Sequence, residues 1–221
     1  MEPLIIVGFI ALFIVLAYFG HLAAKKRRQA MLALAARLGL RFDPSEDRSI
    51  AKRYRFLNQL CQGDNRYAFN VLSGKYKDHD VMAFDFHYEE ESTNSKGERE
   101  TDDYYFSFFI LNLPRSFPEL TIGRETFFSK IGQALGYDDI DFESHEFSRK
   151  FCVRSKDKKF AYDFCNVKMI EYFLSNTDLT VEVENNAMGI YFSSRLEPEK
   201  IEPNHERLVK IRSLMPNYLF S

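Results

Sequence analysis

The sequence has no tryptophan, only three cysteines and no large excess of one charge, and each shortage excludes a class of protein. Cys61, Cys152 and Cys165 form no CxxC pair and leave an odd number. We therefore expect neither a disulfide framework nor a four-ligand zinc site. We expect buried structural thiols in a reducing compartment instead. The 30 Lys and Arg nearly balance the 32 Asp and Glu, which excludes a protein that coats nucleic acid.

The glycine-rich patterns that hold nucleotide phosphates, GxGxxG and GxxxxGK[ST], are also absent, so we expect no nucleotide site of these types. In their place are 22 Phe, 12 Tyr and a hydrophobic content of 45%. That composition supplies a packed core and excludes intrinsic disorder and fibrous classes. A length of 221 residues allows one domain, or a small domain with an appendage.

The appendage is an uncharged run over residues 4–24, LIIVGFIALFIVLAYFGHLAA. A helix needs about 20 such residues to cross the hydrocarbon core of a bilayer. A cleaved signal peptide is the alternative, but it has a basic segment before a shorter apolar run. Here the basic cluster Lys25, Lys26, Arg27 and Arg28 follows the run. We therefore predict an uncleaved transmembrane helix, with the lipid bilayer as its partner.

Charge divides the rest of the chain into two further segments. Residues 25–55 hold ten Lys and Arg against three Asp and Glu, a net charge of +7, and residues 56–221 hold 20 against 28, a net charge of −8. Basic residues beside a span stay on the cytoplasmic side, so we predict a basic helical collar and a cytoplasmic acidic body. The collar acts as a topology signal alone or also binds anionic lipid headgroups. Nucleic acid is not expected as a partner of an acidic body.

The body is predicted to be an α+β domain. Residues 67–72 and 81–88 alternate with period two and are expected to pair as a hairpin around Ser73-Gly74. Residues 104–113 are apolar on both faces, which predicts a central strand ended by Pro114. The acidic stretch 89–103 is expected to be a solvated, flexible loop.

The second half alternates helical and extended patterns. We predict helices over 27–40, 125–135, 157–174 and 203–215, and strands over 147–154, 179–183 and 188–192. In the helix over 157–174, a core stripe is expected at Phe160, Phe164, Val167, Ile170 and Leu174. This order favours an antiparallel sheet with helices on one face over a doubly wound fold.

Two groups of side chains suggest chemistry. Asp138, Asp139, Asp141 and His145, with Glu143 and Glu146 nearby, are candidate ligands for a divalent cation. The spacing is not that of an EF-hand, and solvated or structural carboxylates are the preferred interpretation. Asp85 and His87 share one strand face, with Ser107 as a conceivable nucleophile, but no GxSxG turn accompanies them. We assign no catalytic residue and expect no cofactor.

Four strings, YAFNVLSG at 67–74, VMAFDF at 81–86, DDIDFES at 138–144 and EFSR at 146–149, resemble a group of bacterial proteins without an assigned activity. The resemblance covers about residues 40–175 and implies a bacterial source, and hence the inner or plasma membrane. It supplies no catalytic residues.

We therefore expect a single-pass membrane protein whose cytoplasmic domain serves interaction or scaffolding with a protein partner. Two alternatives remain open. One is a metal-dependent hydrolase that uses the acidic cluster. The other is a small-ligand sensor with a pocket lined by Phe and Tyr.

Overall fold

A computed structural model describes residues 2–94, 97–125 and 139–221. Its long N-terminal helix α1 runs through Glu2–Leu38. The shorter helical elements are α2 (Arg48–Arg53), η1 (Asn58–Cys61), α4 (His145–Lys150), α5 (Lys158–Phe164), α6 (Val167–Ser175), η3 (Pro198–Lys200), α7 (Ile201–Leu214) and η4 (Asn217–Phe220). The strands are β1 (Arg41–Asp43), β2 (Asp64–Tyr76), β3 (His79–Thr93), β4 (Arg99–Gly123), β5 (Cys152–Ser155) and β6 (Val181–Tyr191).

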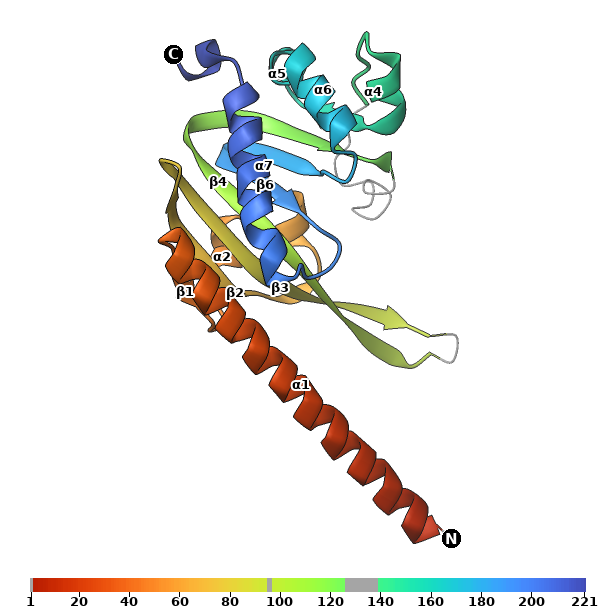
Figure 1. The fold of residues 1–221 in the computed structure, drawn as a ribbon. Coiled ribbons are helices and arrows are strands. Elements are labelled where there is room, and N and C mark those ends of the chain that lie inside the picture. Colours follow the sequence, from red (N-terminus) through yellow and green to blue (C-terminus); the bar gives the residue numbers. More distant parts are fainter. Residues whose placement is uncertain (1, 95–96, 126–138) are drawn as a thin grey trace.

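The strands form one antiparallel sheet in the order β1-β2-β3-β4-β5, and β6 also pairs with β4. Because β4 pairs with β3, β5 and β6, it is the central strand of the body, as its two apolar faces predict. The predicted α+β class with an antiparallel sheet and packed helices is confirmed (Figure 1).

Helical elements cover both faces of this sheet, so the prediction of helices on one face is wrong. The larger core includes residues of α1, α5, α6 and α7, together with Val81 and Ala83 of β3. A second core includes residues of α2 and η1, together with Phe84 and Phe86 of the same strand. Both faces of β3 are therefore buried. The face that carries Asp85 and His87 also carries the apolar Val81 and Ala83, at the end of the strand nearest the turn that joins β2 to β3.

The C-terminal part of α1 belongs to the larger core. Met31, Leu34 and Ala35 are buried there as the helical spacing predicts, and Gly39, with a φ of +69°, follows the helix in the left-handed conformation that glycine favours. The N-terminal part extends beyond the body (Figure 1).

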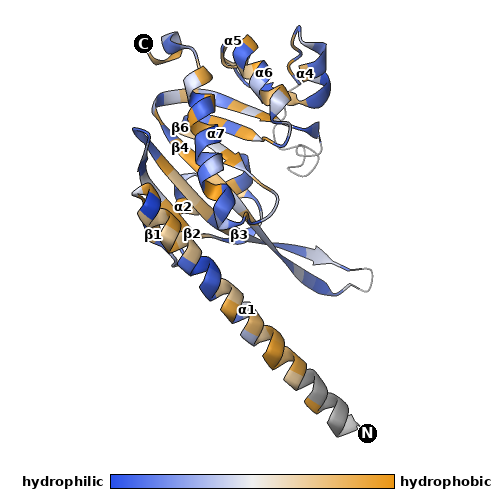
Figure 2. Ribbon diagram, viewed as in Figure 1, coloured by the Kyte–Doolittle hydropathy of each residue, from blue (hydrophilic) through white to orange (hydrophobic). Residues whose placement is uncertain are grey.

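Nine large apolar side chains are exposed along this extension, counting only those whose burial the structure describes: Val7, Leu12, Phe13, Ile14, Val15, Leu16, Tyr18, Phe19 and Leu22. Figure 2 shows this apolar stretch and the hydrophilic band that follows it where α1 reaches the body. In the part of the chain that the structure describes, no helix combines the length and the apolar character needed to cross a membrane.

The predicted hairpin of β2 and β3 forms, but its turn lies elsewhere. Ser73 and Gly74 pair with Met82 and Val81 inside the ladder. The chain reverses at Lys77 and Asp78, whose φ angles of +48° and +65° are those of a type I′ turn. The strands are longer than their apolar pattern because exposed residues at the ends still pair through the backbone.

Strand β4 continues past Pro114, contrary to prediction. The register between β4 and β6 shifts between Asn112 and Phe117, so the proline falls at an irregularity where no ladder hydrogen bond is required of it. The N-terminal part of β4 pairs with β3 from Tyr88–Tyr104 to Thr93–Arg99. This two-stranded arm projects from the body (Figure 1) and replaces the flexible loop predicted over 89–103. Beyond Tyr88 and Glu89, residues 90–93 and 99–104 of the arm are exposed on both faces, which is why no alternating apolar pattern marks it.

Three other predicted elements differ in the second half. Residues 147–150 belong to α4, since the Ser144 hydroxyl accepts from the backbone N–H of Phe147 and caps a helix. The predicted helix over 157–174 is two helices, because Asn166 caps a new one. Val167 is exposed there, and Met169 and Phe173 are buried instead. Residues 181–191 form one strand and not two strands with a turn. Asn185, whose φ is +51°, lies where the register with β4 shifts, and the extra residues of this irregularity belong to β4.

Helix α7 agrees with the predicted helix over 203–215. The predicted helix over 125–135 lies outside the described residues, apart from its first residue.

Candidate functional site

A largely buried ion pair joins α1 to the sheet. Arg27 Nε and Nη2 donate to the two carboxylate oxygens of Asp85 at 3.1 and 2.9 Å, and Nη1 donates to the carbonyl of Leu196 at 2.7 Å. The side chains of Arg27 and Asp85 are 15% and 1% exposed. A bidentate pair with little access to water is strongly directional, so α1 is fixed to β3 at this point.

Asp85 collects two more hydrogen bonds on the sheet. Asn70 Nδ2 donates to Oδ2 at 2.9 Å and the Ser107 hydroxyl donates to Oδ1 at 3.0 Å. Ser107 Oγ in turn accepts from the backbone N–H of Leu196 at 2.9 Å. The carboxylate is thus held by β2, β4 and α1 together, which is the arrangement that a buried charge requires.

This network bears on the trio Asp85, His87 and Ser107. Asp85 contacts Ser107 directly, whereas His87 binds Asp103 and the backbone of Asn65. A Ser–His–Asp relay needs the imidazole between the hydroxyl and the carboxylate, and here it lies outside that line. The three side chains share a region of the sheet but do not form a catalytic arrangement.

His87 lies at the base of the arm. Its side chain is 2% exposed and lies between the rings of Tyr67 and Tyr105, at centroid distances of 4.5 and 4.7 Å. Nε2 is 2.6 Å from Asp103 Oδ1 and Nδ1 is 3.3 Å from the Asn65 carbonyl oxygen. Both partners are hydrogen-bond acceptors, and the tautomer of the ring decides which of its nitrogens donates.

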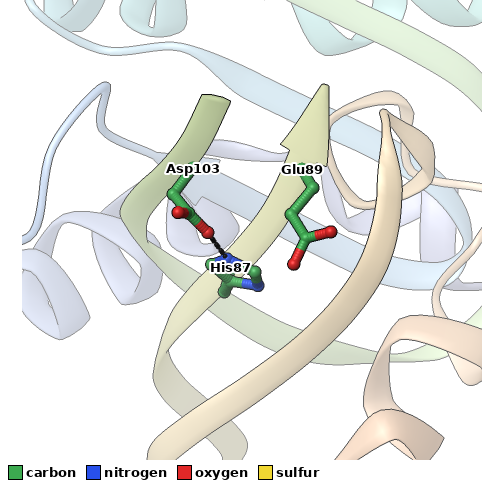
Figure 3. A group of neighbouring side chains, drawn as sticks. All are labelled: His87, Glu89 and Asp103. Carbon is green, nitrogen blue, oxygen red and sulfur yellow. Dashed lines mark hydrogen bonds and ion pairs between the residues drawn. The ribbon is translucent and has the colours of Figure 1, made fainter. Parts of the chain in front are cut away.

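His87, Glu89 and Asp103 place their ligand atoms within 4.8 Å of one another (Figure 3). Elsewhere in the described ranges, no three His, Cys, Asp or Glu side chains meet this closely. Asp103 is 57% exposed and its carboxylate already binds His87, while Asn65 Nδ2 donates to Glu89. The hydrogen bonds between His87 and Asp103 and from Asn65 to Glu89 account for the arrangement of this group.

The predicted acidic cluster is only partly described, since Asp138 lies outside the described residues. Asp139 Oδ1 accepts from the backbone N–H groups of Val153 and Ile140 at 2.6 and 3.1 Å, which ties the segment to β5. Burial raises the pKa of the Asp139 carboxyl. Asp141 and His145 are exposed, and they form no three-residue group with Asp139. The four-residue metal site stays a prediction.

The basic cluster divides between solvent and body. Lys25, Lys26 and Arg28 are exposed, as predicted for a membrane-surface patch, whereas Arg27 points into the body. Arg37, farther along α1, pairs with Glu202 at 2.6 Å. Sequence analysis did not single out Arg27 among the four cations. The signal was present, since Arg27 lies four and seven residues before the buried Met31 and Leu34 and so on the same face of the helix.

A pocket of about 290 Å³ lies between η1, the base of the arm and the end of β6; we call it the tyrosine pocket. Its walls are mostly aromatic. Its polar groups are two amides, one carboxylate, the hydroxyl of one serine and those of four tyrosines. The lining residues are Gln59, Gln62, Tyr88, Glu90, Tyr104, Tyr105, Phe106, Tyr191 and Ser193.

Tyr88 and Tyr104 stack at 4.9 Å with an angle of 10° between their rings, and Phe106 meets Tyr191 edge to face at 5.8 Å. A concave, largely aromatic site with a few converging polar groups is the usual form of a small-ligand pocket. Sequence analysis anticipated aromatic walls without naming residues, because those residues come from separate strands.

Glu182 on β6 is a buried carboxylic acid behind η1. Its side chain is 2% exposed, and Oε2 accepts from the backbone N–H of Asn58 at 2.6 Å. Burial raises the pKa of Glu182 to about 8, so this carboxyl holds its proton at neutral pH. Sequence analysis missed it, although a single acid between Val181 and Val183 was a usable signal.

The three cysteines are free thiols. Cys165 is buried, Cys152 is half-buried and Cys61 is exposed, so the prediction of buried thiols is wrong for Cys61. Burial raises the pKa of the Cys152 thiol to about 11, which keeps it protonated.

Comparison with known proteins shows the fold. No family model matches the chain, and no curated protein matches it. Among solved structures it is similar to the crystal structure of the mycobacterial trehalose monomycolate transport factor A, TtfA, with a TM-score of 0.57 and 11% sequence identity. The match covers 87% of this chain and 96% of that chain.

Proposed function

We propose that this chain is a non-enzymatic interaction domain, held by α1 at the cytoplasmic face of a bacterial inner or plasma membrane. The observation that carries the proposal is α1 itself. It continues from an apolar run into the core of the domain without a linker, and Arg27 fixes it to Asp85.

The exposed apolar side chains of α1 support insertion into lipid. Phe13, Val7 and Phe19 are 74%, 63% and 62% exposed in a stretch where the sequence has no charge from residue 4 to 24. Each exposed Å² of apolar surface costs about 25 cal/mol in water, so a continuous apolar helix surface requires a cover. A bilayer covers every side of the helix at once.

The basic residues that follow the apolar run support a fixed distance between the body and the membrane surface. Lys25, Lys26 and Arg28 are exposed, and anionic headgroups attract each such residue by roughly 1 kcal/mol. Arg27 is only three residues after Ala24, a rise of about 4.5 Å along a helix. The body therefore lies directly against the membrane surface and presents its acidic surface to a protein partner.

Fractionation tests the anchor. Phe13→Lys with Leu16→Lys places two cations in the run, each costing about 2.5–3.5 kcal/mol at the centre of a membrane helix. We expect the full wild-type chain to stay with membranes after an alkaline carbonate wash and the variant to be released. The matched control, Tyr162→Lys with Val167→Lys, changes two exposed residues of the body and stays bound. Release of the wild-type chain by carbonate would contradict the proposal.

The orientation and the partner are tested separately. A fluorescent reporter fused after Ser221 is expected to be active inside the cell, and a reporter active only outside the cytoplasm would refute the orientation. Cross-linking in intact membranes is expected to join the body to a protein partner, and the carbonate-released variant should lose that product. A cross-link pattern identical in both would refute scaffolding at the membrane.

Small-ligand sensing is the second candidate, and the tyrosine pocket favours it. The metal-dependent hydrolase remains a prediction based on Asp138, Asp139, Asp141 and His145. Thermal unfolding with Mg²⁺, Mn²⁺, Ca²⁺ or Zn²⁺ tests it, because an ion at 100 times its Kd stabilises the folded state by about 2.7 kcal/mol. An increase of several degrees that Asp141→Asn abolishes would favour the hydrolase over our proposal.

A further inference from the structure

The tyrosine pocket carries an inference that goes beyond membrane anchoring. We propose that it binds a neutral sugar ring. The pocket is formed where the arm leaves the body, with Tyr88 on β3, Tyr104 and Phe106 on β4, and Tyr191 on β6. About 290 Å³ is at the lower end of ligand-pocket sizes and suits a single ring.

The charge of the lining selects against anions. Glu90 is the one charged residue among those that line the pocket, and no Lys, Arg or His is present there. Phosphate and carboxylate ligands are normally held by Arg, Lys or clusters of backbone N–H groups. The Tyr104 hydroxyl is hydrogen-bonded to Glu90, which leaves further acceptor positions on that carboxylate.

The hydrogen-bonding groups require a ligand that both accepts and donates. Gln62 Nε2 is buried, and no group in the described ranges pairs with it. A buried amide donor without a partner is costly and points to an acceptor supplied from outside. Glu90 at the other wall accepts only. A hydroxyl does both, since its oxygen accepts from Gln62 while its proton goes to a carboxylate.

The aromatic walls complete the match. The C–H edges of a sugar ring are weakly positive and pack against the negative faces of aromatic rings. An ammonium ion also suits aromatic walls with a carboxylate, but it offers no acceptor to Gln62. A polyhydroxylated ring satisfies the walls, the amide and the carboxylate together, and its source is either a free glycoside or the headgroup of a glycolipid.

Binding is tested on the full chain in a polyoxyethylene detergent, which has neither a sugar nor an ammonium group. The probes are methyl glucoside, methyl galactoside and methyl mannoside, their octyl glycosides, and tetramethylammonium. Saturation-transfer NMR reports the bound ring protons and calorimetry gives the Kd. We expect at least one glycoside to bind in preference to tetramethylammonium. Equal affinity of methyl and octyl forms indicates a free glycoside, and tighter octyl binding that a pocket variant abolishes indicates a lipid headgroup.

Two variants locate the binding. Tyr104→Ala removes an exposed ring from the wall, and Gln62→Leu removes the orphan donor. We expect each to weaken glycoside binding at least about tenfold, while Gln62→Leu keeps or raises the thermal midpoint because a buried unpaired amide is gone. Tyr104→Phe keeps the ring and is expected to retain most affinity. Tyr162→Ala, an exposed tyrosine of α5 outside the pocket, is the control.

Three results would overturn the assignment. They are no glycoside binding by the folded wild-type chain, glycoside binding that survives both Tyr104→Ala and Gln62→Leu, or preferential binding of tetramethylammonium. The last result would make the pocket an ammonium cage. None of them affects the carbonate test of the anchor, so the two proposals fail independently.

Discussion

The carboxylate of Asp85 on β3 is paired with the guanidinium of Arg27, 58 residues earlier on α1, through two contacts of 2.9 and 3.1 Å. Asn70 and Ser107 bind the same carboxylate. The pair therefore joins the end of the apolar run to the middle of the sheet, and it is the structural reason why the helix and the body share one orientation.

Arg27→Gln is expected to destabilise the domain by about 3–5 kcal/mol, because it leaves the Asp85 carboxylate buried without its counter-charge. Lys26→Gln, one residue away and exposed, is expected to change stability by less than about 0.5 kcal/mol. Urea unfolding of the full chain in detergent, followed by circular dichroism, measures both.

The double variant Arg27→Met with Asp85→Leu provides the decisive comparison. Replacing both members of a buried pair by apolar residues is often nearly neutral, so we expect it to be more stable than Arg27→Gln. Equal loss in Arg27→Gln and Lys26→Gln would show that the pair is not a buried contact in solution.

Glu182→Gln is expected to remove a loss of folding stability that the wild-type chain undergoes as pH rises from about 4.5 to about 8. The pKa of Glu182 is about 8 in the folded state and about 4.5 when exposed, so the folded chain holds a proton that the unfolded chain has lost between these pH values. Stability from this group therefore falls as pH rises through that window, by at most about 1.4 kcal/mol per pH unit.

We expect the free energy of unfolding of Glu182→Gln, measured with urea, to increase relative to that of the wild type as pH rises from 5 to 8. Glu171→Gln, which alters an exposed carboxyl of α6, serves as the control and should run parallel to the wild type. A gap between Glu182→Gln and wild type that does not change with pH would contradict the buried protonated state.

His205 is expected to make the domain sensitive to acid. It is fully buried beside Tyr76 and Phe109, and burial lowers the pKa of its imidazole from 6.5 to about 4. As pH falls, the imidazole is protonated in the unfolded chain near pH 6.5 but in the folded chain only near pH 4. The folded state therefore has its full stability from this group above pH 6.5 and loses stability as pH falls toward 4.

His205→Leu is therefore expected to lose less stability than the wild type between pH 7 and 5, as measured by the urea midpoint. His145→Leu, at an exposed position, should leave the acid sensitivity unchanged. The opposite result, in which only His145→Leu flattens the pH profile, would remove His205 as the cause.

Gly189→Ala is expected to destabilise the second core by about 1–3 kcal/mol, the usual cost of overpacking. A Cβ at this position of β6 would lie 2.6 and 2.9 Å from two ring carbons of Phe108, and that ring is fully buried and stacked on Phe84. Phe108→Leu should make the added methyl less costly. Gly20→Ala, with no atom within 4 Å, is the control, and a loss as large there would contradict the packing argument.

Local sequence patterns correctly predicted the elements that depend on residues close together in the chain. Pro203 near its start and Pro216 beyond its end placed α7, and period-two alternation placed the hairpin of β2 and β3. Pro114 was wrongly predicted to end its strand because the consequence of a proline depends on the pairing with β6. That pairing is interrupted between Asn112 and Phe117, and Pro114 lies among the extra residues of β4 there. The arm was missed because its two charged strands are mostly exposed and so carry no apolar pattern, although they pair through the backbone.

The same division applies to the site. Strand geometry placed Asp85 and Ser107 on one region of the sheet, where they do meet. That Arg27 completes the group, and that tyrosines of β3, β4 and β6 enclose one pocket, depends on contacts between distant segments. No periodicity in one segment contains that information.

The length of β4 has a mechanical consequence. The strand that begins the arm at Arg99 ends at Gly123, between β5 and β6, on the far side of the sheet. A load on the arm is therefore transmitted along the backbone into the strand with neighbours on both sides, and not into an edge strand that peels away. Separating the arm from the body requires breaking the hydrogen bonds of β4 with its neighbours at the centre of the sheet. A force applied to the arm therefore acts directly on the core of the domain.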